Sequence, residues 1–226
     1  MSDSWQSRLP EAVRMRAESL GESGTAWMRS LDDRVEHLKS LWDIEPGEVR
    51  AGGSESLVVE VTRADGSPAM IKIGLPGPSD LTHEAYVLKL GAGHGYADLY
   101  GESADVNAIL IERLGESLSR RVESVDMQIR LICRTLCQAW MPVGADDRLM
   151  TGARKAEWLA TFIREKWEAL NRPCEQSTVD RALQFADQRA AAYSPDNSVL
   201  VHGDAHADNT LIAVDADREE EIICKF

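Results

Sequence analysis

Residues 201–209 read Val-His-Gly-Asp-Ala-His-Ala-Asp-Asn, the most informative segment of the chain. Apolar segments on either side, Ser198–Val201 and Thr210–Val214, predict two short strands joined by a polar loop. The loop carries Asp204 and Asn209, five residues apart. Phosphoryl transfer requires a carboxylate that accepts the proton of an attacking hydroxyl and a neutral oxygen that helps to hold Mg²⁺. The loop therefore predicts a phosphoryl-transfer centre.

The first half of the chain changes from a helical to a strand pattern at Pro46-Gly47. Residues 1–45 read as helical, with one helix at Glu11–Leu20 and a second that begins at Ser30 or Asp32. An antiparallel meander is expected next. Its parts are strands at 48–51, 57–62 and 69–73, a glycine-rich turn at 52–54 and a hairpin turn at Asp65-Gly66. A helix that Ser79 or Asp80 caps is expected after the meander, followed by strands at 97–102 and 108–114.

The second half is mostly helical. Helices are expected from Ser124 to Trp140, from Lys155 to Asn171, and from a Ser177 cap to about Tyr193; the strand hairpin, a charged turn at 215–221 and a strand opening at 222–224 follow. The pattern predicts an α+β architecture of two lobes, residues 1–114 and 115–226. Tryptophans at helical positions are expected to fill the core, namely Trp42, Trp140, Trp158 and Trp167.

His202-Gly203-Asp204, followed by four residues and Asn209, resembles the catalytic signature of the aminoglycoside phosphotransferases and related antibiotic and choline kinases. The resemblance implies a two-lobed protein-kinase-like fold, with an antiparallel sheet in the N-terminal lobe and a mostly helical C-terminal lobe. It implies ATP and Mg²⁺ as cofactors, Asp204 as the catalytic base and Asn209 as a metal ligand. His202 is implied to brace the loop.

The first half of the chain resembles this family in the same order. Lys72 resembles the strand lysine that holds the phosphates of the nucleotide, and Glu84 matches the helical glutamate that pairs with this lysine. Small residues in a turn let backbone amides approach phosphate oxygens, and the backbone of the lobe connector binds adenine in the family. The residues implied for these two roles are Gly52, Gly53 and Ser54 in the turn and Glu112 and Leu114 in the connector.

Within the family, three segments look like the streptomycin and hydroxyurea resistance kinases: residues 52–56, 68–74 and 200–211. This resemblance implies transfer of phosphate from ATP to a hydroxyl of a small-molecule antibiotic, either an aminoglycoside such as streptomycin or hydroxyurea. Such a reaction confers resistance. An acidic surface suits the guanidinium groups of streptomycin.

The resemblance also implies a second metal-binding Asp on the strand after the catalytic hairpin. Asp215 and Asp217 lie in the preceding turn and do not match that position, and the sequence given ends at Phe226. We therefore expect a kinase-like fold that is incomplete at its C-terminus and transfers phosphate very poorly. Apolar surface left uncovered would favour low solubility or self-association.

The composition limits the classes of molecule that the protein is expected to bind. The net charge of -13 repels phosphate backbones and anionic membranes, so neither nucleic acid nor a membrane is expected, whereas a cationic small molecule would be attracted. The four cysteines form no C-x-x-C pair, and Cys133 and Cys137 are interpreted as buried thiols or neighbours on one helical face. Without a signal peptide or an apolar span in the sequence, a reducing cytoplasm is expected. The oligomeric state is left open.

Two other functions stay open at this point. His202, Asp204, His206 and Asp208 alternate along the chain, and in an extended strand they would face one side as ligands of a hydrolase metal ion. The chain could instead bind a nucleotide without transferring phosphate. A serine hydrolase is disfavoured because the sequence has no Gly-x-Ser-x-Gly motif.

Overall fold

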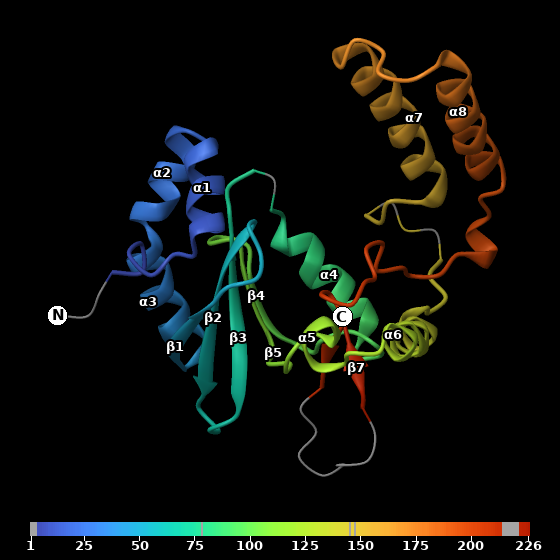
Figure 1. Ribbon diagram of the computed structural model, residues 1–226. Helices are drawn as coiled ribbons and strands as arrows, with labels where there is room; N and C mark the ends of the chain where they lie inside the picture. Colours follow the sequence, from blue (N-terminus) through green and yellow to red (C-terminus); the bar gives the residue numbers. More distant parts are fainter. Residues whose placement is uncertain (1–3, 78, 145, 147, 214–221) are drawn as a thin grey trace. The chain divides into compact units, whose positions relative to one another are not determined.

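A five-stranded antiparallel sheet with the strand order β1-β2-β3-β5-β4 organises the computed structural model (Figure 1). The structure describes residues 4–77, 79–144, 146, 148–213 and 222–226. The chain divides into two units, residues 1–139 with 201–226, and residues 140–200. The lobe boundary expected at residue 114 stays a prediction.

The predicted meander and the two strands after it are confirmed, with differences of a few residues at their ends. They are β1 (Ile44–Arg50), β2 (Ser56–Arg63), β3 (Pro68–Gly74), β4 (Leu99–Ser103) and β5 (Ala108–Glu112). Pro46-Gly47, which the sequence pattern indicates as the boundary between the helical segment and the first strand, lies inside β1 instead. The register of β1 against β2 shifts between Pro46 and Val49, and such a bulge tolerates a proline that cannot donate to the ladder.

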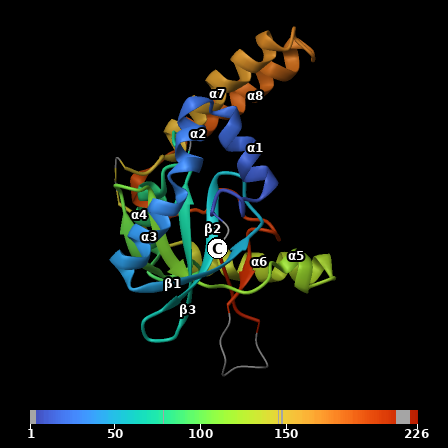
Figure 2. The same ribbon diagram turned by 90° about the vertical axis from the view of Figure 1, so that its left-hand side faces the viewer.

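Three helices cover one face of this sheet, and α4 lies on the other face (Figures 1 and 2). The three are α1 (Glu11–Ser19), α2 (Glu22–Arg29) and α3 (Leu31–Trp42), of which α2 was not predicted as a separate helix. Their buried side chains join alternate residues of β2 and β3, such as Val59 and Ile71, in one core. At Gly24 a Cβ atom would lie 1.8 Å from the carbonyl oxygen of Ala17, so this helix contact requires glycine.

Helix α4 (Leu81–Gly91) begins where the sequence indicated. The Asp80 side chain accepts hydrogen bonds from the backbone amides of Thr82 at 3.0 Å and His83 at 3.3 Å, and the hydrogen bond from the Thr82 hydroxyl lowers the pKa of Asp80. The helix ends at Ala92, whose φ of 44° is left-handed. The capped start fixes the position of Glu84 in the first turn of α4.

The rest of the first unit holds the polar loop. It comprises α5 (Leu118–Arg121), α6 (Val125–Ala139) and a two-stranded sheet of β6 (Leu211–Ile212) and β7 (Cys224–Lys225). The strand predicted at Ser198–Val201 is wrong, because only Val199 forms an isolated bridge, with Pro142. The charged turn predicted at 215–221, with Asp215 and Asp217, lies outside the described residues.

The second unit is a pair of packed helices, α7 (Gly152–Ala169) and α8 (Gln176–Ala191), followed by the short 3-10 helix η1 (Pro195–Asn197) (Figure 1). Thr151 caps α7, and its hydroxyl accepts from the amide of Arg154 at 3.2 Å. The predicted Ser177 cap of α8 is wrong, because the N-cap is Glu175 and Ser177 lies within the helix.

Several residues expected in the core lie at the surface. Trp140 and Trp158 are exposed, and Trp158 stacks on Phe162 with Lys155 over its ring at 4.0 Å. Cys133 and Cys137 are also exposed, because the buried face of α6 carries Leu131, Thr135 and Ala139 instead. In the described part of the chain, no helix is long and apolar enough to cross a membrane.

Candidate active site

The face of the sheet that points away from α1–α3 carries Lys72. In β3 the residues on either side of it, Ile71 and Ile73, are buried in the core with the helices, so Lys72 points the other way. Residues paired across antiparallel strands share a face, and Lys72 pairs with Val58 of β2 and Ile109 of β5. This side of the sheet, here called the Lys72 face, is the one on which α4 packs.

Lys72 and Glu84 form an ion pair, as the sequence predicted. The Nζ atom of Lys72 lies 2.6 Å from Oε1 and 2.8 Å from Oε2 of Glu84, so the ammonium group contacts both carboxylate oxygens. Both side chains are partly exposed, at 24% for Lys72 and 36% for Glu84. The ammonium group is therefore held in place by α4 and still open to a ligand on the Lys72 face.

The glycine-rich turn links β1, which ends at Arg50, to β2, which begins at Ser56. Gly52 has a φ of 157°, which residues with a Cβ atom rarely adopt, and Cβ atoms built on Gly52 or Gly53 would meet nothing within 4 Å. The hydroxyl of Ser54 contacts only Glu55 among the described side chains, at 3.5 Å. The turn is open on its outer side, as a turn that covers phosphates requires.

The polar loop brings Asp204 and Asn209 together. The Asn209 amide donates to the backbone oxygen of Asp204 at 3.0 Å and to its Oδ2 at 3.1 Å. Gly203, with a φ of 84°, makes the turn before Asp204. Asn209 also donates its backbone N–H to the oxygen of His206 at 3.1 Å. Asp204 is thus fixed from one side, and its side chain is exposed on the other.

His202 braces this loop. Its Nδ1 accepts the backbone N–H of Asp204 at 3.4 Å, and its ring stacks on Phe226 with a centroid separation of 4.6 Å. Burial lowers the pKa of His202, although the negative charge of Asp204 acts to raise it. The ring is therefore neutral near pH 7. The charge of Glu84 also acts on His202, which places the Lys72–Glu84 pair within electrostatic range of the loop.

Lys225 of β7 forms ion pairs with two carboxylates, Glu112 at the end of β5 and Asp98 before β4, and these contacts are here called the clasp. Lys225 Nζ lies 2.6 Å from Glu112 Oε2 and 3.3 Å from Asp98 Oδ2. Burial acts to lower the pKa of Lys225, but the hydrogen bond and charge of Glu112, with those of Asp98, raise it overall. The carboxylate of Glu112 is therefore bound by Lys225 in this clasp. Two residues on, the backbone N–H and C=O of Leu114 make no hydrogen bond with any described residue.

The metal-hydrolase alternative does not fit this loop. His206 lies between two carboxylates, with Nε2 3.7 Å from Oδ2 of Asp204 and Nδ1 3.8 Å from Oδ2 of Asp208. The chain turns at residues 207–209, however, and His202 stacks on Phe226, so the four alternating side chains do not form one row as they would in a strand. Asp208 instead accepts a hydrogen bond from the Ser119 hydroxyl of α5. Across the described ranges, no three His, Cys, Asp or Glu residues are arranged to hold a metal ion.

The family model of the aminoglycoside/hydroxyurea antibiotic resistance kinases matches residues 41–218. The chain belongs to this family. The match includes β1 to β5, the Lys72–Glu84 pair and the polar loop, which are the parts from which the resemblance was inferred. This kinase family membership also favours phosphoryl transfer over the metal-hydrolase alternative.

Curated relatives of this chain carry related names. A streptomycin 6-kinase of Streptomyces glaucescens is 34% identical over 128 residues, which cover 56% of this chain and 40% of the relative. A streptomycin 6-kinase of Streptomyces griseus is 26% identical over 94% of this chain and 68% of its own length. A hydroxyurea phosphotransferase of Kitasatospora aureofaciens is 28% identical over 53% and 37%. The chain thus spans less than half the length of two of these relatives.

Solved structures confirm the protein-kinase-like fold of this chain. An ethanolamine kinase of Plasmodium vivax superposes with a TM-score of 0.55 at 14% identity, covering 84% of this chain and 58% of its own. A macrolide 2'-phosphotransferase of Brachybacterium faecium gives 0.52 at 18% identity, covering 84% and 69%. A choline kinase of Cryptosporidium parvum gives 0.51 at 12% identity, covering 81% and 57%.

Sequence reasoning missed the apolar part of the candidate site. Met70 pairs with Ile111, and Val58 pairs with Lys72, so these side chains lie on the Lys72 face. All three apolar residues are half-buried. Side chains in a strand alternate between its two faces. Applied to 57–62 and 69–73, with Lys72 as the reference, this alternation would have indicated that Val58 and Met70 share its face.

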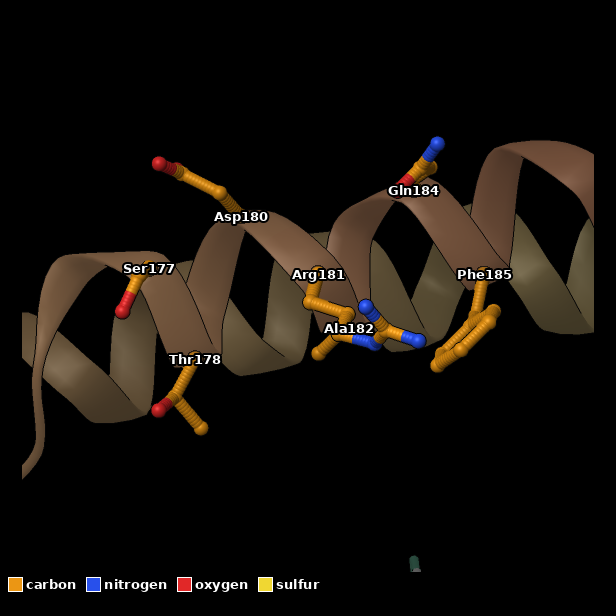
Figure 3. Close-up of a pocket in the computed structure, with 7 residues that line it drawn as sticks. All are labelled: Ser177, Thr178, Asp180, Arg181, Ala182, Gln184 and Phe185. Carbon is orange, nitrogen blue, oxygen red and sulfur yellow. The ribbon is translucent and has the colours of Figure 1, made fainter.

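The second unit carries a shallow hollow that belongs to a single helix. Its lining residues all come from α8 and include Asp180, Arg181 and Phe185 (Figure 3). None of the site residues predicted from the sequence lines it. An open hollow on one helix face is not the concave site that a nucleotide requires.

Proposed function

We propose that this protein is an ATP-dependent phosphotransferase that phosphorylates a hydroxyl group of a small-molecule antibiotic. The observation that carries the proposal is the presence, in one unit, of the Lys72–Glu84 ion pair and the Asp204–Asn209 pair. The first pair supplies an oriented cation for phosphates, and the second supplies a fixed, exposed carboxylate. Together they form the equipment for phosphoryl transfer by positioning and electrostatics.

The nucleotide would lie on the Lys72 face. Lys72 holds the phosphates and Glu84 orients Lys72, while the turn at Gly52, Gly53 and Ser54 covers the phosphates with backbone amides. The base lies against the apolar residues of this face, and the connector offers the backbone N–H and C=O of Leu114. Glu112 contributes through its backbone position, because its side chain is bound by Lys225.

Asp204 would act as the general base. Its carboxylate accepts the proton of the acceptor hydroxyl as the oxygen attacks the γ-phosphate. Asn209 keeps this carboxylate in place and presents its amide oxygen as a metal ligand. Carboxylate and amide oxygens are hard donors of the kind that Mg²⁺ prefers, and bound Mg²⁺ neutralises charge on the phosphates.

The acceptor would be an aminoglycoside such as streptomycin, or hydroxyurea. The names of the curated relatives support both. The net charge of -13 favours attraction of a cationic aminoglycoside over long range. The same charge opposes nucleic acid as an acceptor.

Incubation with Mg-ATP and either streptomycin or hydroxyurea tests this proposal. Mass spectrometry of the acceptor should show slow accumulation of a phosphorylated product that the Asp204→Ala variant does not form. Choline serves as a control acceptor that should stay unmodified. ATP binding without any product from either antibiotic would favour the alternative, a nucleotide-binding protein that does not transfer phosphate.

A further inference from the structure

A cluster of three charged residues borders the Lys72 face on the side opposite the Lys72–Glu84 pair. Oε1 of Glu60 accepts hydrogen bonds from Nε of Arg50 at 2.8 Å and from Nη2 of Arg50, and it lies 2.9 Å from Nη2 of Arg113. Arg50 ends β1 just before the glycine-rich turn, Glu60 lies in β2, and Arg113 lies in the connector. The cluster therefore joins the three segments that surround the proposed nucleotide.

The strand register places this cluster on the Lys72 face. Arg50 pairs with Val58, which pairs with Lys72, so these three side chains form one row across β1, β2 and β3. Glu60 pairs with Met70, which pairs with Ile111, and these form the next row. Val58 thus lies between Arg50 and Lys72, and Met70 lies beside Glu60 and two residues before Lys72 in β3.

The two charged groups differ in net charge. The charge of Lys72 is balanced by Glu84, whereas two guanidinium groups share the single carboxylate of Glu60. Glu60 is 20% exposed, but Arg50 is 54% exposed. The cluster is therefore a local positive site with an accessible guanidinium group, in a chain whose net charge is -13.

We propose that the Arg50–Glu60–Arg113 cluster is the base-side wall of the nucleotide site, and that the purine ring stacks on the Arg50 guanidinium. The inference rests on the proposed function, because it needs a nucleotide with its phosphates at Lys72. A nucleotide in that orientation extends its base across Val58 and Met70 toward the connector, where the cluster lies. Glu60 holds the guanidinium plane, and Arg113 ties this wall to the connector.

Arginine suits this role for a physical reason. A guanidinium group is planar and weakly hydrated, and it stacks on aromatic rings while its edge donates hydrogen bonds to a carboxylate. Lysine carries the same charge without the plane. Stacking of this kind on a partly desolvated ring corresponds to roughly a five- to thirtyfold change in affinity.

Calorimetry of the full chain with two Mg²⁺-loaded probes tests the assignment: ATP, and inorganic tripolyphosphate, which has the phosphates without the base. Arg50→Ala should weaken ATP binding by roughly five- to thirtyfold and leave tripolyphosphate binding unchanged. Arg50→Lys, which keeps the charge and disturbs folding least, should lose most of the same ATP affinity. Lys72→Ala should weaken both probes. Arg63→Ala is the matched control, because Arg63 ends β2 as Arg50 ends β1 and lies beside its own carboxylate, Asp65, and it should change neither.

The outcomes separate this inference from the proposed function. Equal weakening of both probes by Arg50→Ala would show a phosphate contact and overturn the base-side assignment. Unchanged ATP binding in both Arg50 variants would overturn it as well, while the Lys72→Ala result would still support the proposed function. If the unaltered chain bound neither probe, the proposed function would fail and this inference with it.

Discussion

Lys72 in β3 and Glu84 in the first turn of α4 meet through both carboxylate oxygens, at 2.6 and 2.8 Å from the ammonium nitrogen. Two features create this contact. The alternation of β3 turns Lys72 away from the core, and the Asp80 cap fixes where α4 begins. The pair lies within electrostatic range of the loop that carries Asp204, so both halves of the proposed site belong to one unit.

Glu84→Gln tests the orienting role of the carboxylate. We expect Mg-ATP affinity to fall about tenfold, because the Lys72 ammonium loses its partner and its fixed position. The free energy of unfolding should change by less than about 1 kcal/mol, since the pair is partly exposed. Glu102→Gln is the matched control, because Glu102 pairs with Lys89 of the same helix at 2.5 Å. An equal loss of affinity in both variants would contradict the prediction.

Asn209→Ala should reduce the effect of Mg²⁺ on nucleotide binding. The unaltered chain is expected to bind ATP more tightly with Mg²⁺ than without it, and the variant should lose most of that gain. Asp204→Ala should leave ATP affinity within about twofold, because a catalytic base acts on the acceptor rather than on nucleotide binding. Titrations with and without Mg²⁺ measure both effects. A Mg²⁺ gain that persists in Asn209→Ala would argue against the metal-ligand role.

Lys225→Met should destabilise the first unit. It leaves the Glu112 carboxylate, 19% exposed, without the ammonium group that lies 2.6 Å away. Removing one partner of a largely buried pair costs about 1–3 kcal/mol of unfolding free energy at this partial burial. The double variant Lys225→Met/Glu112→Gln should recover part of the loss in urea denaturation, since no unpaired charge remains at Glu112. A double variant as unstable as the sum of the two single variants would show that the clasp is not a coupled pair.

The burial of His202 makes stability depend on pH in a defined direction. Because the folded-state pKa is lowered, the unfolded chain binds a proton more readily than the folded one. The contribution is fully present above the unfolded pKa of about 6.5, and it is lost as pH falls through that value toward the lower folded pKa. His202→Asn keeps an acceptor near the Asp204 amide but does not titrate. Urea unfolding at pH 8 and pH 5.5 should show a larger loss for the unaltered chain, and equal losses would refute the prediction.

Local patterns in the sequence predicted much of the site. The β-branched pattern in 57–62 and 69–73 predicted the strands that carry the site, and the cap at Ser79 or Asp80 placed Glu84 in the helix that follows. The spacing of Asp204 and Asn209 placed both in one loop, where they do form a hydrogen bond. These features depend on residues near one another in the chain, which is where propensity and capping rules apply.

The remaining parts depend on contacts between distant residues. The clasp between Lys225 and Glu112 joins positions 113 apart, and no local pattern indicates it. No local pattern distinguishes Glu60 from other strand residues, because Arg50 and Arg113 lie beside it only in the folded structure. Trp158 was expected in the core because tryptophan is apolar, yet it is exposed under Lys155. Tertiary context decided each of these outcomes.

The most direct test of the kinase interpretation is calorimetric titration of the 226-residue chain with Mg-ATP, alongside Lys72→Ala and the matched variant Lys89→Ala. Lys89 also pairs with a carboxylate, at 2.5 Å, but lies apart from the proposed nucleotide contacts. We predict saturable binding that Lys72→Ala weakens at least about tenfold and Lys89→Ala leaves unchanged. A folded chain that binds no ATP, or binds it equally well in all three forms, would contradict the account.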